Sequence, residues 1–312
     1  MPRSLGRQLL EFARTIRLEH TLFALPFALG TAMLAEPPCP DAAALALLVA
    51  CMATARTAAM GFNRVADAAL DARNPRTADW PIPAGRLGRG TALALALGSG
   101  AAFIGCAALF RPLRGNAWPA GLAPAFLAVL FGYSYTKRLT VLSHWVLGLC
   151  LGLAPVGTWI ALRGGLALLP VLIGAGVLFW TAGFDILYAL PDVDFDRREG
   201  LRSIPARFGE RGAHVAAALA HVAALAFLAA VLLVDAAGAR PVLGRASLAA
   251  LFLIAVTLSA QHLRARSAGS RAIAQGAKAG GDPRAFVSWN AAVSTVWLAG
   301  VVGDVVLARV QG

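Results

Sequence analysis

The chain has 312 residues, of which 58% are hydrophobic and only 14% are charged, and its mean hydropathy is +0.68. A soluble globular domain carries about 25% charged residues, so this composition excludes an ordinary soluble protein and indicates a membrane protein. Lys and Arg outnumber Asp and Glu by 28 to 16, which gives a formal net charge of +12. In a chain this apolar, the positive charge favours a role in membrane topology and in binding anionic headgroups or phosphates, and no nucleic-acid partner is expected.

Nine stretches of the chain carry few or no charges and have about the length of a membrane-spanning helix, which needs ~20 apolar residues. They are rich in Ala, Gly and Leu and poor in β-branched runs, which suits tightly packed helices and not a barrel. We therefore predict an all-α membrane protein with nine transmembrane helices, forming a single domain over residues 1–312. The first stretch is short and the eighth is borderline. The nine ranges are roughly 20–35, 42–62, 90–110, 115–136, 139–162, 164–184, 212–234, 246–263 and 285–307.

Positive charge is distributed unevenly over the two sides that nine crossings would create. One side holds the N-terminal segment and the turns after the even-numbered spans, and it receives 22 of the 28 Lys and Arg residues. By the positive-inside rule, this side is the cytoplasmic face of a bacterial-type inner membrane.

The segment before the first span, residues 1–19, is a poor secretory signal because it contains Glu11 and Glu19. Two interpretations stay open: a soluble tail, or a short amphipathic helix at the membrane interface. In the second case the lipid-facing residues would be Leu9, Leu10, Phe12 and Ile16.

A first cluster of polar residues lies where the second span ends. Its members, at helical spacing on one predicted helix face, are Arg56, Asn63, Asp67 and Asp71. Asn74-Pro75 then ends the helix, and two further prolines predict an irregular loop over residues 73–89. A loop of this kind at the membrane edge can close over a site and exclude water.

A second acidic cluster repeats the first at a fixed offset, since adding 125 to 63, 67 and 71 gives Tyr188, Asp192 and Asp196. Asp185 precedes them, deep enough in an apolar run to need a partner or a cation. A second basic, proline-containing loop follows at residues 197–211. The repetition predicts two related halves of the chain whose acidic ends meet.

Carboxylates crowded in this way repel one another unless a cation binds among them. Their hard oxygen atoms suit Mg²⁺, which commonly binds one or two carboxylates together with phosphate oxygens. Nearby basic side chains would bind the remaining phosphate charge. These are Arg76, Lys137, Arg138 and Arg202, with Tyr133 on the same predicted helix face as Lys137. The pattern predicts chemistry in which diphosphate leaves and apolar helices hold a lipid tail and exclude water.

At these residues the sequence resembles the UbiA superfamily of intramembrane aromatic prenyltransferases, over nearly the whole chain. The motifs that carry the resemblance are Asn63-x3-Asp67-x3-Asp71 with Asn74-Pro-Arg-Thr77, Tyr133-Ser-x2-Lys137-Arg138, Asp185-x2-Tyr188-x3-Asp192-x3-Asp196 and Ser203-Ile-Pro-Ala-Arg207-Phe-Gly. With His20-Thr-Leu-Phe-Ala-Leu-Pro-Phe27 in the first span, the sequence looks most like the 4-hydroxybenzoate polyprenyltransferase branch. A similar subgroup prenylates a dihydroxynaphthoate in menaquinone biosynthesis.

The resemblance implies a nine-helix bundle with a central cavity, in which two Mg²⁺ ions hold a polyprenyl diphosphate. The implied metal ligands are Asn63, Asp67, Asp71, Asp192 and Asp196. The implied substrate-binding residues are Arg56 for the carboxylate of the aromatic acid, and Asn63, Arg76, Tyr133, Lys137, Arg138, Arg202 and Ser203. Ionisation would give an allylic cation that the ring attacks next to its hydroxyl group, with Tyr188 and Asp185 orienting or stabilising the reactants.

The sequence departs from the family pattern at two positions. Trp80 stands where the family usually has Arg before the proline, which puts one phosphate contact of the first loop in doubt. Pro191 removes a helical N–H directly before Asp192 and predicts a bend in the second cluster.

Two other functions stay open. Acidic residues could line a cation pathway in a transporter, although such a pathway needs charges at several depths and these cluster at one side. A related enzyme could use a haem or chlorophyll-type acceptor, although Arg56 and the loop motifs favour an aromatic acid. The remaining candidates are interpreted as structural groups: the four cysteines, His144, His214, His221 and His262.

Overall fold

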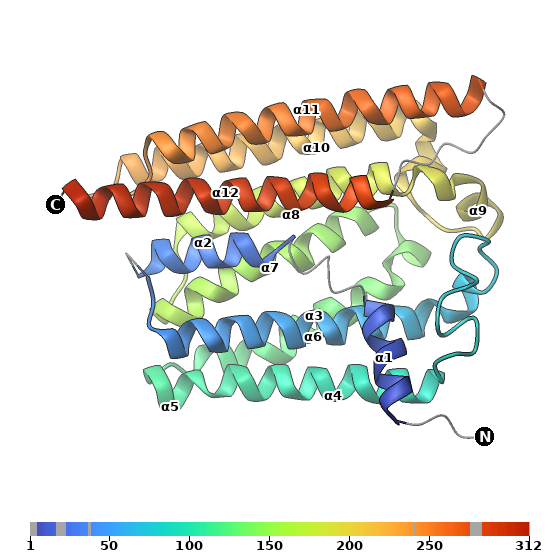
Figure 1. Cartoon of the computed structure of the whole chain (residues 1–312), viewed down its shortest axis with the longest axis horizontal. Helices are drawn as coiled ribbons and strands as arrows, with labels where there is room; N and C mark the ends of the chain where they lie inside the picture. The colour runs from blue at the N-terminus through green and yellow to red at the C-terminus, as the bar shows by residue number, and fades with distance from the viewer. Residues whose placement is uncertain (1–4, 17–22, 37–38, 240, 275–282, 312) are drawn as a thin grey trace. The chain divides into compact units, whose positions relative to one another are not determined.

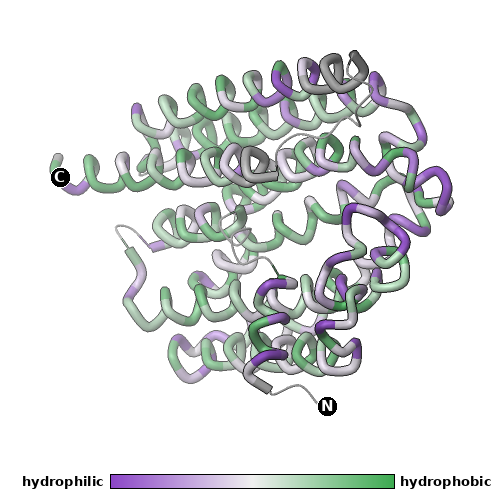
Figure 2. Tube along the Cα trace, turned by 45° about the vertical axis from the view of Figure 1, so that its right-hand side comes forward, coloured by the Kyte–Doolittle hydropathy of each residue, from purple (hydrophilic) through white to green (hydrophobic). Residues whose placement is uncertain are grey.

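The computed structural model describes residues 5–16, 23–36, 39–239, 241–274 and 283–311, and within these ranges every regular element is a helix (Figure 1). Residues of the first-span motif such as His20 lie outside these ranges. The long helices are coloured mainly as hydrophobic in Figure 2, and hydrophilic residues gather at the turns that join them. The predicted all-α membrane class is confirmed.

Seven of the described helices are long and apolar enough to cross a membrane, so the protein is a multi-pass membrane protein. These spans are Ala42–Asp71, Arg89–Arg114, Ser143–Arg163, Leu168–Tyr188, Ile204–Ala236, Arg245–Ser267 and Ser288–Val310. The other two predicted spans coincide with α2 (Leu25–Ala35), which is apolar but short, and α6 (Trp118–Leu139), which contains Pro124 and ends in two cations. The count of nine crossings therefore stays a prediction.

The chain forms two compact units, Met1–Thr21 with Ala43–Tyr135 and Leu22–Ala42 with Thr136–Gly312. The helices of unit 1 are α1 (Leu5–Ile16), α3 (Ala42–Asp71), α4 (Arg89–Ala108), α5 (Phe110–Arg114) and most of α6. Gly61 of α3 lets α1 and α4 approach closely, because an added Cβ would lie 2.9 Å from Phe12 and 3.0 Å from Ala96. Phe62 of α3 stacks on Phe131 of α6, with ring centroids 4.4 Å apart.

Of the two interpretations left open for the N-terminal segment, the helix is present as α1, but only half of the side suggested to face lipid is exposed. Phe12 and Ile16 are buried and pack with Val65 of α3 and with Ile82 and Leu87 of the following loop, chiefly because Gly61 leaves room for the Phe12 ring. Leu9 and Leu10 are exposed, as predicted. The helix therefore uses one apolar side to pack on its own unit.

Unit 2 contains α2, α7 (Ser143–Arg163), α8 (Leu168–Tyr188), the 3-10 turn Leu190–Asp192, α9 (Val193–Arg198), α10 (Ile204–Ala236), α11 (Arg245–Ala274) and α12 (Pro283–Gln311). Helix α8 packs against both α7 and α10, and α12 packs against α11 and α2. Gly148 and Gly152 of α7 face the α8 backbone at Leu178 and Gly174, so the two helices touch through their main chains.

The core of unit 2 is aromatic. Phe27 of α2 lies between Trp180 of α8 and Trp297 of α12, with centroid distances of 5.4 and 6.1 Å. His221 of α10 and His262 of α11 share a hydrogen bond of 2.8 Å. None of the four cysteines forms a disulfide bond.

Pro191 interrupts the second acidic cluster, as predicted. Helix α8 ends at Tyr188, the 3-10 turn contains Pro191 and Asp192, and α9 starts at Val193. The predicted loop 197–211 is wrong in extent, because α10 already begins at Ile204. The Ser203 side chain accepts from the Ala206 N–H and so caps the helix, and Gly209 then breaks its regularity at φ 70°.

Candidate functional site

The first polar cluster occupies the last turns of α3 in unit 1. The helix is continuous from Ala42 to Asp71, so the spacing of Asn63, Asp67 and Asp71 keeps them together as predicted. Asn63 donates a hydrogen bond from Nδ2 to Oδ2 of Asp67 at 3.4 Å. Asp67 and Asp71 are both buried. Burying two acids at a helix C-terminus is unfavourable without a cation, because the helix dipole is negative there.

The loop over residues 72–88 starts by closing the end of α3. Thr77 donates from Oγ1 to the carbonyl oxygen of Asp71 at 2.9 Å, and the Arg76 N–H donates to Oδ1 of Asn74 at 2.9 Å. Asn74 and Thr77 are both buried, whereas Arg76 is exposed. The motif Asn74-Pro-Arg-Thr77 thus satisfies orphan carbonyls of α3 and fixes the direction in which the loop leaves it.

Sequence reasoning missed one cation beside this cluster. The guanidinium of Arg64 lies 3.6 Å from Oδ2 of Asp71, and its Cζ lies 4.0 Å from the ring centroid of Trp80. A signal was present in the sequence, because residues seven apart share a helix face and Arg64 precedes Asp71 by seven.

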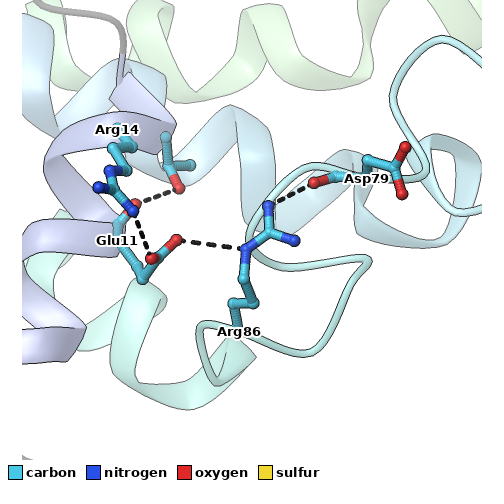
Figure 3. Close-up of polar contacts among 5 residues, drawn as sticks. Glu11, Arg14, Asp79 and Arg86 are labelled. Carbon is cyan, nitrogen blue, oxygen red and sulfur yellow. Dashed lines mark hydrogen bonds and ion pairs between the residues drawn. The ribbon is translucent and has the colours of Figure 1, made fainter.

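The far end of the loop is tied to α1 (Figure 3). Buried Glu11 accepts a hydrogen bond from Arg14 at 2.9 Å and pairs with Nε of Arg86 at 3.5 Å, while Arg86 also donates to the carbonyl oxygen of Asp79. The carbonyl oxygen of Glu11 accepts from Thr15 at 2.7 Å. The loop is therefore held at both ends within unit 1.

Two other predicted residues of unit 1 lie on α3 and α6. Arg56 donates from its guanidinium to the carbonyl oxygen of Ile16 at 3.1 Å, which joins α3 to the end of α1. Tyr133 is half-buried in the last turns of α6.

In unit 2, Asp185 has the partner that its depth requires. His144 of α7 lies with Nδ1 2.7 Å from Oδ2 of Asp185, and its Nε2 accepts from the Ile204 N–H at 3.3 Å. Because Nε2 is an acceptor, Nδ1 carries the hydrogen and donates to the carboxylate. His144 is thus a satisfied polar group, as predicted, and it joins α7, α8 and the start of α10. Tyr188, one turn after Asp185, is half-buried.

The second carboxylate pair is divided between the 3-10 turn and α9. Ser203 donates to Oδ2 of Asp196 at 2.7 Å. Burial raises the pKa of Asp196 above its usual value, as does the charge of Asp192, while the Ser203 hydrogen bond and the cation of Lys137 act to lower it. A bound cation would relieve this excess of negative charge.

The basic residues of unit 2 are organised by backbone contacts. The Arg202 N–H donates to the carbonyl oxygen of Lys137 at 2.7 Å, and its guanidinium donates to that of Leu139 at 2.6 Å. Arg202 therefore fixes the C-terminal end of α6, which carries Lys137 and Arg138, against the turn before α10.

The donor sets fit a hard divalent ion that also binds phosphate. Each unit brings two carboxylates with hard oxygen atoms, and no three His, Cys, Asp or Glu side chains converge anywhere in the described part of the chain. Mg²⁺ suits such sets, because it binds through one or two carboxylates and completes its octahedron with substrate phosphates and water.

Comparison with known proteins identifies the family of the chain. The model of the UbiA prenyltransferase family matches residues 24–279. A 4-hydroxybenzoate octaprenyltransferase of Polynucleobacter necessarius is 31% identical over 212 residues, which are 66% of this chain and 71% of that protein. The apo structure of a UbiA homologue from Aeropyrum pernix K1 aligns with a TM-score of 0.75 at 31% identity, over 94% of this chain and 99% of that one. A UbiA homologue from Archaeoglobus fulgidus bound to DMAPP and Mg²⁺ shares the fold, with a TM-score of 0.70 at 18% identity over 95% and 99% of the two chains.

Proposed function

Because the chain belongs to the UbiA prenyltransferase family and is a prenyltransferase of the membrane, we propose that it transfers a polyprenyl group from polyprenyl diphosphate to 4-hydroxybenzoate in quinone biosynthesis. The observation that carries this proposal is the pair of carboxylate clusters at the ends of apolar helices, each with cations of its own unit nearby. The name of the relative from Polynucleobacter supports 4-hydroxybenzoate as the acceptor.

In this proposal the acidic residues of both units bind Mg²⁺. Mg²⁺ supplies Lewis-acid catalysis, since it neutralises charge on the diphosphate as the carbon–oxygen bond breaks. The proposed ligands are Asn63, Asp67 and Asp71 in unit 1 and Asp192 and Asp196 in unit 2. The structure of the Archaeoglobus relative, which contains DMAPP and Mg²⁺, supports this choice of metal.

Basic and polar residues would then bind the parts of the substrates that carry charge. Lys137 and Arg138 would bind diphosphate, together with Arg76, Tyr133, Arg202 and Ser203, and Arg56 would bind the carboxylate of the acceptor. Asp185, held by His144, and Tyr188 would orient the reactants while the aromatic ring attacks the allylic carbon. Apolar helix faces would hold the isoprenoid chain away from water.

We propose a cytoplasmic N-terminus, with both acidic clusters on that side of the membrane. Labelling of single introduced cysteines in intact cells, in a chain whose four native cysteines are replaced by serine, tests the orientation. A cysteine at exposed Arg73 should resist a membrane-impermeant reagent, and one at exposed Arg111 should react.

The decisive experiment supplies labelled polyprenyl diphosphate and a panel of acceptors to membranes that contain the protein. Transfer to 4-hydroxybenzoate that stops with a chelator supports the proposal, and transfer to a dihydroxynaphthoate alone would move the enzyme to menaquinone biosynthesis. No transfer to any aromatic acceptor, in membranes that contain the inserted protein, would overturn it.

A further inference from the structure

Arg64 connects the first acidic cluster with the loop that follows it. Its side chain is 18% exposed and contacts Asp71, the last residue of α3, whose own side chain is 11% exposed. On its other side it covers the ring of Trp80, in the middle of the loop. One guanidinium therefore bridges a proposed metal ligand and an aromatic side chain from a different segment.

The Trp80 ring is carried by a rigid part of the loop. The Trp80 N–H donates to the carbonyl oxygen of Thr77 at 2.9 Å, and the Ala84 N–H donates to that of Trp80 at 2.9 Å. Pro81 fixes the next backbone angle and is buried. The ring thus has a defined place relative to the end of α3.

Stacking on an aromatic ring leaves the binding edge of a guanidinium available for anions. Arginine stacks through its flat face, while its N–H groups lie in the plane and point outward. Here that edge carries Nη1, which lies 3.6 Å from Asp71. An ammonium group has no flat face and could not make both contacts in the same way.

We propose that Arg64 binds the diphosphate of the substrate and that Trp80 is the positioning residue that holds it there. This inference rests on the proposed function. In the substrate-free protein Arg64 neutralises Asp71. Were Asp71 to bind Mg²⁺, the metal would neutralise its charge, and the N–H edge of the stacked Arg64 guanidinium would be available to the phosphate oxygens of the substrate. Trp80 keeps the cation beside the site during this exchange of partners.

Trp80 also has a role in this proposal, although the family usually has arginine at its position. Position 80 of the loop carries no cation, but its aromatic ring holds Arg64, the cation that α3 contributes from the residue directly after Asn63. The positive charge beside Asp71 therefore comes from α3, through Arg64, and not from the loop.

The test uses the full chain purified in detergent and measures Mg²⁺–pyrophosphate binding by calorimetry, beside KM for each substrate. Arg64→Gln should weaken pyrophosphate binding and raise KM for polyprenyl diphosphate by about tenfold or more, because a charge-assisted hydrogen bond is lost. KM for the aromatic acceptor should stay unchanged. Arg64→Lys, which keeps the charge but not the stack, should be intermediate, and Arg89→Gln at the exposed start of α4 is the matched control.

Trp80 is tested by coupling and by rescue. Trp80→Leu should weaken pyrophosphate binding less than Arg64→Gln does, and it should add nothing in the Arg64→Gln background. Trp80→Arg in that background should restore much of the lost affinity, since it returns a cation to the cluster. Trp118→Leu, at an exposed tryptophan of unit 1, is the matched control.

A folded Arg64→Gln protein that binds pyrophosphate as tightly as the wild type would overturn the proposal, and so would full additivity of Arg64→Gln and Trp80→Leu. If Arg64→Gln does not fold, Trp80→Leu and Trp80→Phe decide the matter, because unchanged pyrophosphate affinity in Trp80→Leu also contradicts the proposal. Failure of the wild type to prenylate any acceptor contradicts the proposed function alone, because pyrophosphate binding is measured without an acceptor.

Discussion

The two acidic clusters have the same spacing in the sequence but are built in different ways. In unit 1 a single helix carries Asn63, Asp67 and Asp71, and an arginine of the same helix neutralises its last carboxylate. In unit 2 the chain changes from α8 to a 3-10 turn and then to α9, so Asp185, Asp192 and Asp196 lie on three elements. The first cluster is ordered by helical periodicity, and the second by side-chain hydrogen bonds from His144 and Ser203.

The largest effect on the transfer rate is expected when one carboxylate is removed from either cluster. We expect Asp67→Ala and Asp192→Ala each to lower the transfer rate by roughly 10²–10³-fold or more, because each removes charge that stabilises the metal–diphosphate complex. Radiolabelled product measures the rate, and insertion in the membrane is followed by immunoblot. If one variant kept full activity, only the other cluster would serve catalysis. Asp79→Ala, at an exposed acid of the loop, is a control.

His144 is the next most sensitive position, because three helices depend on it. His144→Ala leaves the Asp185 carboxylate and the buried Ile204 N–H without their partner, and we expect a loss of about 2–4 kcal/mol in the free energy of unfolding. Thermal unfolding in detergent measures this loss. His144→Asn, which keeps a polar group, should lose less, and equal stability of His144→Ala and the wild type would contradict the role assigned to the pair.

One hydroxyl group hydrogen-bonds to each cluster, and removing it should lower the stability less than His144→Ala does and by a similar amount in both units. Ser203→Ala removes the N-cap of α10 and Thr77→Val removes the hydroxyl group that donates to the Asp71 carbonyl oxygen, so each should cost about 1 kcal/mol of stability. Ser203→Gly should cost only a few tenths, because glycine is tolerated at N-caps. Chemical denaturation of the purified variants tests this order. A neutral Thr77→Val would show that the loop needs no closure at that end.

The smallest effect is expected at the ion pair between α1 and the loop. Arg86 is 46% exposed and Arg14 is 63% exposed, so solvent screens both contacts of Glu11, and Glu11→Gln should cost only about 0.5–1 kcal/mol. Faster cleavage of the 72–88 loop by added protease, with unchanged cleavage in the 197–203 region, would show that α1 holds the first loop specifically. Equal acceleration in both regions would contradict this.

The sequence predicts which residues lie together when they share one helix, but not when they come from two separate segments. Helical spacing alone places Asn63, Asp67 and Asp71 together, because all three lie on one unbroken helix. The contact between Arg64 and Trp80 joins two segments whose relative position no spacing rule supplies. For α1 the periodicity predicts an apolar face, but only the gap above Gly61 decides that Phe12 is buried while Leu9 is exposed.

The extent of the second loop could have been predicted better. Ser203 followed by Ile204 and Pro205 is a helix-start signal, since a hydroxyl caps the helix and proline suits its first turn. The need of Asp185 for a partner was predicted, but the choice of His144 was not, because the two residues are 41 positions apart. A position within an apolar span predicts that a charged group needs a partner, but only the packing of the helices determines which residue that partner is.

The close approach of α7 and α8 limits how this enzyme can be engineered. Replacing helix glycines with alanine is a common route to thermostable variants, since it lowers the entropy of the unfolded chain. At Gly148, Gly152 and Gly174 an added methyl group would overlap main-chain carbonyl oxygens of the opposite helix. At Gly98 and Gly132 it would meet no atom within 4 Å. A mutant library for this protein should keep the first three glycines unchanged and vary the last two.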